Sequence, residues 1–156
     1  MSLKLPSSVL RVLNDIGTPG CLDAAARLAS SGHPSGSYTL HLRSSGIGPS
    51  QADLLAQAIE QDARVGARLE SFSISYNSHV SDAGVARLVA AFPPSLTQVG
   101  LVGCGLGDVA GQALLTWVRT APALRMLCVE DNGFSSAVRA GLQSLGQGRS
   151  VLMVVV

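Results

Sequence analysis

Short segments of alternating apolar and polar residues recur at a nearly constant spacing along most of the chain. LTQVGLVGCGL begins at Leu96 and LRMLCVEDNGF begins at Leu124, 28 residues later, and both fit the pattern L-x-x-(V/L)-x-(L/V)-x-x-(C/N)-x-(L/F). LESFSISYN from Leu69 and YTLHLRSSGI from Tyr38 carry apolar residues at the same spacing, and VLMVVV from Val151 starts another such segment. Alternation of period two is typical of β-strands, so the sequence predicts five strands.

A run with helical spacing follows each of the first four segments. Apolar or small residues recur there at steps of about four, which places them on one face of a helix. Pro93-Pro94 and Pro122 end two of these runs. The segment between Ile59 and Leu69 is longer than its counterparts, and we expect it to loop outward. The residues at these steps are Gln51, Leu55 and Ile59; Gly84, Leu88 and Phe92; Ala110, Leu114 and Val118; and Val138, Leu142 and Leu145.

The beginning of the chain departs from this pattern. Val9, Leu13 and Ile16 share one helical face that stops at Gly17, and a second helix opens at Pro19. A pair of helices at one end of a stacked array would close its exposed core. The sequence therefore predicts an N-terminal helical cap.

The consensus, together with a helix that completes a period of about 28 residues, resembles the leucine-rich repeat of the long, helix-containing, ribonuclease-inhibitor-like subtype. The resemblance covers about residues 37–156, with Ser37 and Ser45 as departures. It implies an α/β fold: a short right-handed leucine-rich-repeat solenoid with a parallel β-sheet on the concave side, helices on the convex side and the helical cap. We expect a single domain over residues 1–156, with the cap in residues 1–36 and about four repeats plus a terminal strand after it.

Proteins of this family usually bind other proteins, so the resemblance implies a non-enzymatic protein–protein interaction module. The concave positions grade from polar and basic at the first strand to apolar and acidic at the fourth. Aromatic and arginine side chains are the commonest hot spots of protein interfaces. We expect a protein partner to contact the concave face or the adjacent loops through Tyr38, His41, Arg43, Tyr76, Met126, Glu130 and Asp131.

The sequence predicts no catalytic residues, no metal site and no cofactor. In the repeat frame His41 and Cys128 share one column but lie three strands apart, about 14 Å at the usual strand spacing, which is too far for a Cys–His pair. His33 and His79 have no partner at metal-ligand spacing. The three cysteines fit neither a disulfide framework nor a zinc motif. The expected column is His41, Ser73, Gly100, Cys128 and Val155.

A glycine-rich turn at Gly103–Gly111 provides an alternative hypothesis, a dinucleotide-binding protein. Gly105-x-Gly107-x-x-Ala110 matches the G-x-G-x-x-A fingerprint, and Glu130 follows Gly105 by 25 residues. The glycines would let a pyrophosphate approach a helix N-terminus while Glu130 bound the ribose. The same strand–turn–helix order recurs in the neighbouring repeats without these glycines, so the repeat alone also explains the turn.

The last predicted strand, VLMVVV, is apolar on both faces. Such a strand leaves an apolar edge of unpaired backbone groups, which soluble proteins generally avoid. We expect Leu152, Met153 and Val155 to be covered. Self-association as a homo-oligomer, strand addition by a partner and a following repeat of a longer protein are the alternatives.

Composition restricts the classes of partner and the compartment. Eleven Lys and Arg against ten Asp and Glu give a net charge of +1, which supplies no electrostatic attraction for nucleic acid or an anionic membrane. No apolar run reaches the roughly 18–20 residues of a membrane-spanning helix. Asp15 lies inside what would be the apolar region of a signal peptide. We therefore expect a cytoplasmic protein that contacts neither membrane nor nucleic acid.

Overall fold

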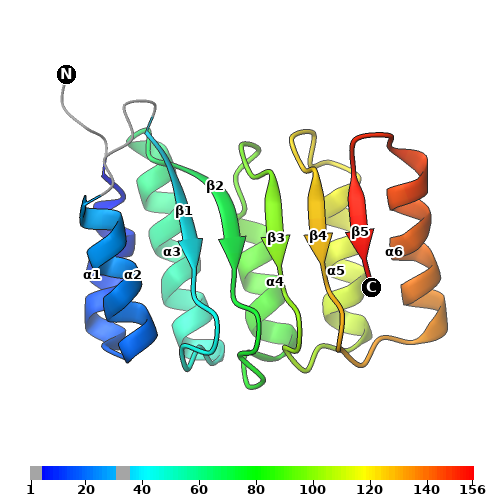
Figure 1. Cartoon of the computed structure of the whole chain (residues 1–156), viewed down its shortest axis with the longest axis horizontal. Helices are drawn as coiled ribbons and strands as arrows, with labels where there is room; N and C mark the ends of the chain where they lie inside the picture. Colours follow the sequence, from blue (N-terminus) through cyan, green and yellow to red (C-terminus); the bar gives the residue numbers. More distant parts are fainter. Residues whose placement is uncertain (1–4, 31–35) are drawn as a thin grey trace.

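The computed structural model describes residues 5–30 and 36–156, and there it shows an α/β fold with six helices and five strands (Figure 1). All five strands are parallel, and their order in the sheet is their order in the chain. This confirms the predicted α/β class and the parallel sheet. The elements are α1 (Ser7–Ile16), α2 (Pro19–Ser30), β1 (Ser37–His41), α3 (Pro49–Arg64), β2 (Arg68–Ser73), α4 (Ser81–Ala91), β3 (Gln98–Gly100), α5 (Asp108–Val118), β4 (Met126–Cys128), α6 (Ser136–Gly148) and β5 (Met153–Val155).

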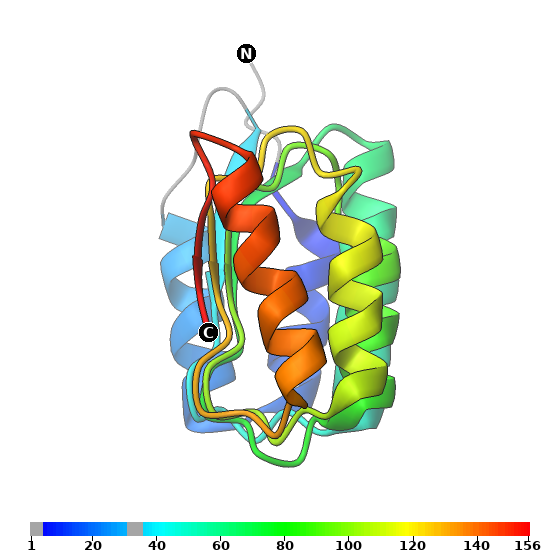
Figure 2. The ribbon, with the colours of Figure 1, turned by 90° about the vertical axis from the view of Figure 1, so that its right-hand side faces the viewer.

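The strands form one layer, and α3 to α6 cover one of its faces (Figure 2). Leu40, Phe72, Val99 and Leu127 point from successive strands toward these helices and are almost fully buried in a single core. Side chains at the alternate strand positions point away from the core, as strand geometry requires. These residues form what we call the open sheet face: Thr39, His41, Ser71, Ser73, Gln98, Gly100, Met126, Cys128, Met153 and Val155.

Strand pairing places residues of the open sheet face in the register that the sequence pattern predicts. Each of the four parallel pairings joins neighbours of the expected column, His41, Ser73, Gly100, Cys128 and Val155. One register shift interrupts the β1–β2 pair between Tyr38 and Thr39. Because of it, Tyr38 rather than Ser37 pairs with Leu69. Tyr38 also alternates with Leu40 along β1 and fills the first buried position of the strand.

The two N-terminal helices lie at the β1 end of the molecule (Figure 1). Helix α1 packs on α3 and so extends the helical layer, whereas α2 packs beside β1. The buried carboxylate of Asp62, in the last turn of α3, accepts hydrogen bonds from the backbone N–H groups of Ser8 and Val9, each at 2.9 Å. It thereby satisfies free donors at the start of α1. Residues 1–4 and 31–35 of the predicted cap, His33 included, lie outside the described residues.

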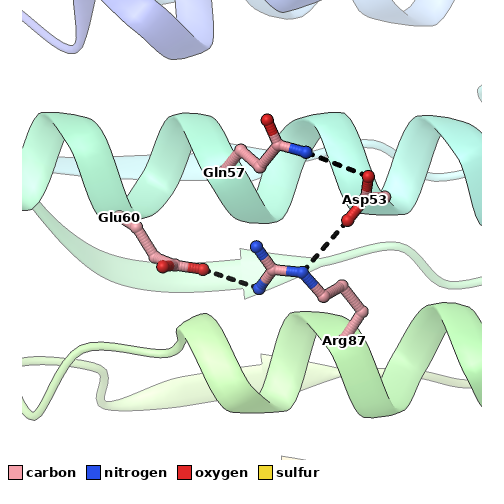
Figure 3. A network of polar contacts seen from close by, with 4 residues as sticks. All are labelled: Asp53, Gln57, Glu60 and Arg87. Atoms are coloured by element: carbon pink, nitrogen blue, oxygen red, sulfur yellow. Dashed lines mark hydrogen bonds and ion pairs between the residues drawn. The ribbon is translucent and has the colours of Figure 1, made fainter.

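Helix α3 is longer than the spacing predicts. The segment after Ile59, expected to loop outward, continues α3 to Arg64, and Asp62 is buried against α1. On the outer surface, Arg87 of α4 bonds to Asp53 at 3.0 Å and to Glu60 at 2.6 Å, both on α3 (Figure 3). All three side chains are partly exposed to solvent, so these ion pairs add little stability.

Asparagine side chains hold successive loops together at the C-terminal ends of the strands. Asn77 Oδ1 accepts from the backbone N–H groups of Ser45 and Ile47, at 3.0 and 2.9 Å. Its Nδ2 donates to the carbonyl oxygens of Leu42 and Ile74, at 2.8 and 2.7 Å. The Asn77 amide is buried, so these backbone groups have a partner where water cannot reach them.

Asn132 makes the same kind of contact between the loops that follow β3 and β4. Its Oδ1 accepts from Cys104 N and Leu106 N, each at 3.0 Å, and its Nδ2 donates to the Leu101 carbonyl at 2.8 Å. Each asparagine therefore ties its own loop to the loop before it.

We predict that Asn77→Ala destabilises the fold by about 2–4 kcal/mol, because it leaves buried donors and acceptors without partners. Chemical denaturation monitored by circular dichroism measures the change. The matched control is Asn14→Ala, since the Asn14 side chain is exposed on α1 and, among the described residues, bonds only to the Leu10 carbonyl. The control is expected to stay within about 0.5 kcal/mol of wild type. Equal effects of the two substitutions would contradict the structural role of Asn77.

Candidate functional site

The predicted contact residues that reach solvent lie along the open sheet face and the loops that follow its strands. His41 and Arg43 come from β1 and its loop, and Tyr76 comes from the loop after β2. Glu130 and Asp131 follow β4, three strands from Arg43 and about 14 Å away at the usual strand spacing. The open sheet face and the loops that follow its strands therefore have a basic end at β1 and an acidic end at β4.

Arg43 and Tyr76 are brought together by the structure. The Arg43 guanidinium lies over the Tyr76 ring, 4.5 Å from its centroid, which is a cation–π contact. The Tyr76 side chain is 44% exposed, and its backbone N–H donates to the Val102 carbonyl at 2.7 Å. Gly103 lies against the ring, where a Cβ atom would be only 2.9 Å from Cδ1 of Tyr76. Tyr76 is thus an exposed aromatic residue held on several sides.

Tyr76 also has a left-handed backbone, with φ at 62°. Equivalent loop positions share this conformation, since φ is 49° at Ser44, 62° at Gly103 and 57° at Asp131. The conformation turns the chain so that the next residue, such as Asn77, points into the molecule. Small polar residues and glycine tolerate it, but a bulky aromatic residue there is strained, as is common at functional sites. Of these four loop positions, the glycine at position 103 is the one whose residue type indicates a left-handed backbone in the sequence.

A shallow pocket of about 320 Å³ lies between the loop after β1 and the loop after β2. The start of helix α3 lines one side of this pocket, and Tyr76 lines another. The pocket is open to solvent and offers hydroxyl, amide and imidazole groups beside the Arg43–Tyr76 pair. Its polar lining residues are Ser44, Gln51, Asn77, Ser78 and His79.

His41 is the last residue of β1 and lines a separate hollow beside α2. Its Nε2 is 2.9 Å from Ser71 Oγ on β2. A smaller hollow of about 170 Å³ separates it from α2 and is lined also by Arg27 and Thr39. His41 therefore faces solvent at the edge of the open sheet face and extends the polar end of that face.

The acidic end contains Cys128 and Glu130. Partial burial raises the pKa of the Cys128 thiol above its usual value, and the negative charge of Glu130 raises it further. The thiol therefore stays protonated at neutral pH and is a poor nucleophile. His41 lies three strands away, as predicted, so the two do not form a Cys–His pair. Among the described residues, no three His, Cys, Asp or Glu side chains are grouped closely enough to hold a metal ion.

Two of the predicted contact residues are buried, so the prediction that they are exposed is wrong. Tyr38, assigned to the partner surface, is only 5% exposed, because it alternates with Leu40 along β1 and so points to the same side, toward the helices. Burial and the nearby charge of Asp62 raise the pKa of its hydroxyl. Leu152, assigned to the exposed edge with Met153 and Val155, is buried, since it lies just before β5 and packs into the core.

The glycine-rich turn is explained by contacts within the protein. Gly105 has φ at 67°, and a Cβ atom there would approach the Ser78 carbonyl oxygen to 2.9 Å. The backbone N–H groups of Gly107 and Ala110, which would face a pyrophosphate, donate instead to the Asp82 carboxylate at 2.8 and 3.1 Å. A phosphate would have to displace a carboxylate of the same charge sign, so the geometry speaks against the dinucleotide hypothesis.

We predict that titration calorimetry with NAD, NADP or ATP shows no micromolar binding, because the Asp82 carboxylate already occupies the start of α5. The Asp82→Ala variant, which frees the two N–H groups, tests whether this carboxylate is the only obstacle. Micromolar binding of any of the three nucleotides to the wild-type chain would contradict this prediction.

A scan against known protein families finds no matching family, and a search of curated proteins finds no match either. No helix in the described part of the chain combines the length and apolar character needed to cross a membrane.

A second carboxylate, that of Asp108, makes a similar contact with the next helix. Its Oδ1 accepts from the backbone N–H of Ser135 at 2.8 Å, just before α6 begins. This bond lowers the pKa of Asp108 below its usual value of 3.8. A lowered pKa means that the folded state favours the charged carboxylate, which stabilises the fold above the usual pKa.

We predict that Asp108→Asn lowers the melting temperature at neutral pH, and that the difference from wild type shrinks as the pH falls through the lowered pKa. Below that point the wild-type carboxyl group is also uncharged and has lost its advantage. Melting curves of both proteins across the acid range provide the measurement. Asp15→Asn, which removes an exposed carboxylate from the end of α1, is the control and is expected to change the melting temperature less. A difference in melting temperature between Asp108→Asn and wild type that does not change with pH would contradict the role assigned to the Asp108 carboxylate.

Proposed function

We propose that this chain is a non-enzymatic protein-interaction module, built as a short leucine-rich-repeat solenoid of the ribonuclease-inhibitor-like kind. Three features support the proposal: parallel strands in chain order, helices α3 to α6 on one face of the sheet, and asparagines that join successive loops from equivalent positions. The consensus pattern and its spacing of about 28 residues support it as well.

The single observation that carries the binding function is Tyr76. An exposed aromatic ring in a strained backbone conformation, packed against Gly103 and stacked with Arg43, is a preorganised contact residue. Binding through such a residue loses little side-chain entropy, because the ring is already ordered. Tyrosine and arginine are also the residue types that contribute most at protein interfaces.

The charges of the face indicate the chemistry of the partner. Arg43 stacks on Tyr76 and forms none of the ion pairs found among the described residues. At the other end, Glu130 also forms none of the ion pairs found among the described residues. The proposed partner is a protein that places an acidic group near Arg43 and a basic group near Glu130, about 14 Å away.

Partner capture from the source cells, followed by calorimetry with the purified partner, tests the proposal. Arg43→Ala and Tyr76→Asn are each expected to weaken binding about ten-fold or more. Asparagine tolerates the left-handed backbone, so Tyr76→Asn should keep the fold, and melting curves check this. Arg119→Ala, an exposed arginine that follows α5, is the matched control and is expected to bind like wild type. Equal retention of every captured protein by all variants would contradict the assignment of this face.

A further inference from the structure

The loop after β4 contains the sequence Asn132-Gly133, in which an asparagine is followed by the smallest residue. Asn14 and Asn77, the other two asparagines of the chain, are followed by an aspartate and a serine. The backbone nitrogen of the next residue can attack the side-chain amide carbon of an asparagine, and a side chain on that next residue hinders the approach. Glycine has no side chain and adopts the widest range of backbone angles. Asn132 is therefore the asparagine whose amide is most open to attack when its loop is free to move.

The reaction at this pair needs water and no other reagent. The Gly133 backbone nitrogen loses its proton to water and forms a bond to Cγ of Asn132. The Cγ–Nδ2 bond breaks, and Nδ2 leaves as ammonia with a proton taken from water. The cyclic imide that results then adds one water molecule at either of its two carbonyl carbons. It opens to aspartate or to isoaspartate, in which the main chain runs through the side-chain carbon, and in both products a neutral amide has become a carboxylate.

The folded loop holds every atom that would have to move. The Gly133 N–H donates to the Leu106 carbonyl at 2.7 Å, so the attacking nitrogen keeps its proton and is directed away from Cγ. The leaving group, Nδ2 of Asn132, donates to the carbonyl oxygens of Leu101 and Val129 at 2.8 and 2.9 Å. Oδ1 accepts from two backbone N–H groups of the preceding loop, which fixes the plane of the amide. Attack on Cγ therefore requires the loop after β4 to open first.

We propose that Asn132 is a self-modification site that the fold protects: it loses its amide while its loop is open, and the product prevents the loop from closing in its native form. A carboxylate has no donor, so the Leu101 and Val129 carbonyl groups lose their partner and face a negative charge instead. That charge also joins Glu130 and Asp131 at the acidic end of the candidate site. Chemical change of the open chain thus makes its unfolding irreversible.

Incubation of the 156-residue chain with and without urea, at one pH and temperature, tests the site and its protection. Peptide mapping by mass spectrometry measures aspartate and isoaspartate at each asparagine. In urea, Asn132 is expected to react at least about ten-fold faster than Asn77, which makes equivalent loop contacts but precedes a serine. Without urea, Asn132 is expected to react at least about ten-fold more slowly than in urea. Equal rates at the two asparagines in urea would overturn the site, and equal rates at Asn132 with and without urea would overturn its protection.

Gly133→Ala tests the consequence for refolding. A Cβ atom at Gly133 would lie 3.4 Å from the Leu106 carbonyl oxygen, an ordinary contact, so this variant should fold, and melting curves check it. After incubation in urea and dilution, the refolded fraction of wild type is expected to fall with incubation time, in step with the modified fraction at Asn132, whereas Gly133→Ala refolds fully. The control Gly148→Ala, at a glycine with open space around it, should behave like wild type.

Two outcomes of the refolding experiment would contradict the proposal. Wild-type chains modified at Asn132 that refold with an unchanged melting temperature would overturn the link between this amide and loop closure. An equal time-dependent loss in Gly133→Ala and in wild type would overturn the assignment of the loss to the Asn132-Gly133 pair.

Discussion

The stacking of this fold depends on buried backbone groups in the loops, which need hydrogen-bond partners that the sheet cannot supply. Strands of three residues, such as β3 and β4, end abruptly, and the chain then turns inside the protein. A carboxamide is suited to this place because it has an acceptor and two donors, and Asn77 uses both kinds on two different loops. Holding the loops together fixes the strands in register, and the register sets which side chains share the open sheet face.

In the helical layer, carboxylates provide hydrogen-bond partners for the free backbone N–H groups at the starts of helices. Asp62, Asp82 and Asp108 each accept from backbone N–H groups at the start of another helix. A helix N-terminus carries free donors and a partial positive charge, so a carboxylate from a neighbouring helix serves both. This is why the glycine-rich turn before α5 binds a group of its own chain where the sequence motif suggested an external phosphate.

The sequence pattern was sufficient for the strands and for the columns of the open sheet face, because each alternating position has one environment. The parallel order was expected from the family resemblance. The pattern failed where the environment depends on a neighbour in space. The register shift against β2 makes Tyr38, and not Ser37, the partner of Leu69, and α3 continues because Asp62 bonds to the start of α1. In the candidate site, Arg43 and Tyr76 were separately identifiable as contact residues. Their stacking was not, because it requires the left-handed backbone of Tyr76 and room beside Gly103.

Cys104 stands where Asn77 and Asn132 stand in the neighbouring loops, and its thiol donates to the Ile74 carbonyl at 3.2 Å. A thiol is a weak acceptor, so the backbone hydrogen bonds that Cys104 receives from Tyr76 and Asn77 are weaker than those an asparagine would accept. Tyr76, by contrast, remains anchored to Val102. The result is an aromatic residue whose position is set by its own main-chain bond and by Gly103, and does not depend on an asparagine in the following loop. Replacing Cys104 would therefore alter the stability of the loop more than the position of the ring.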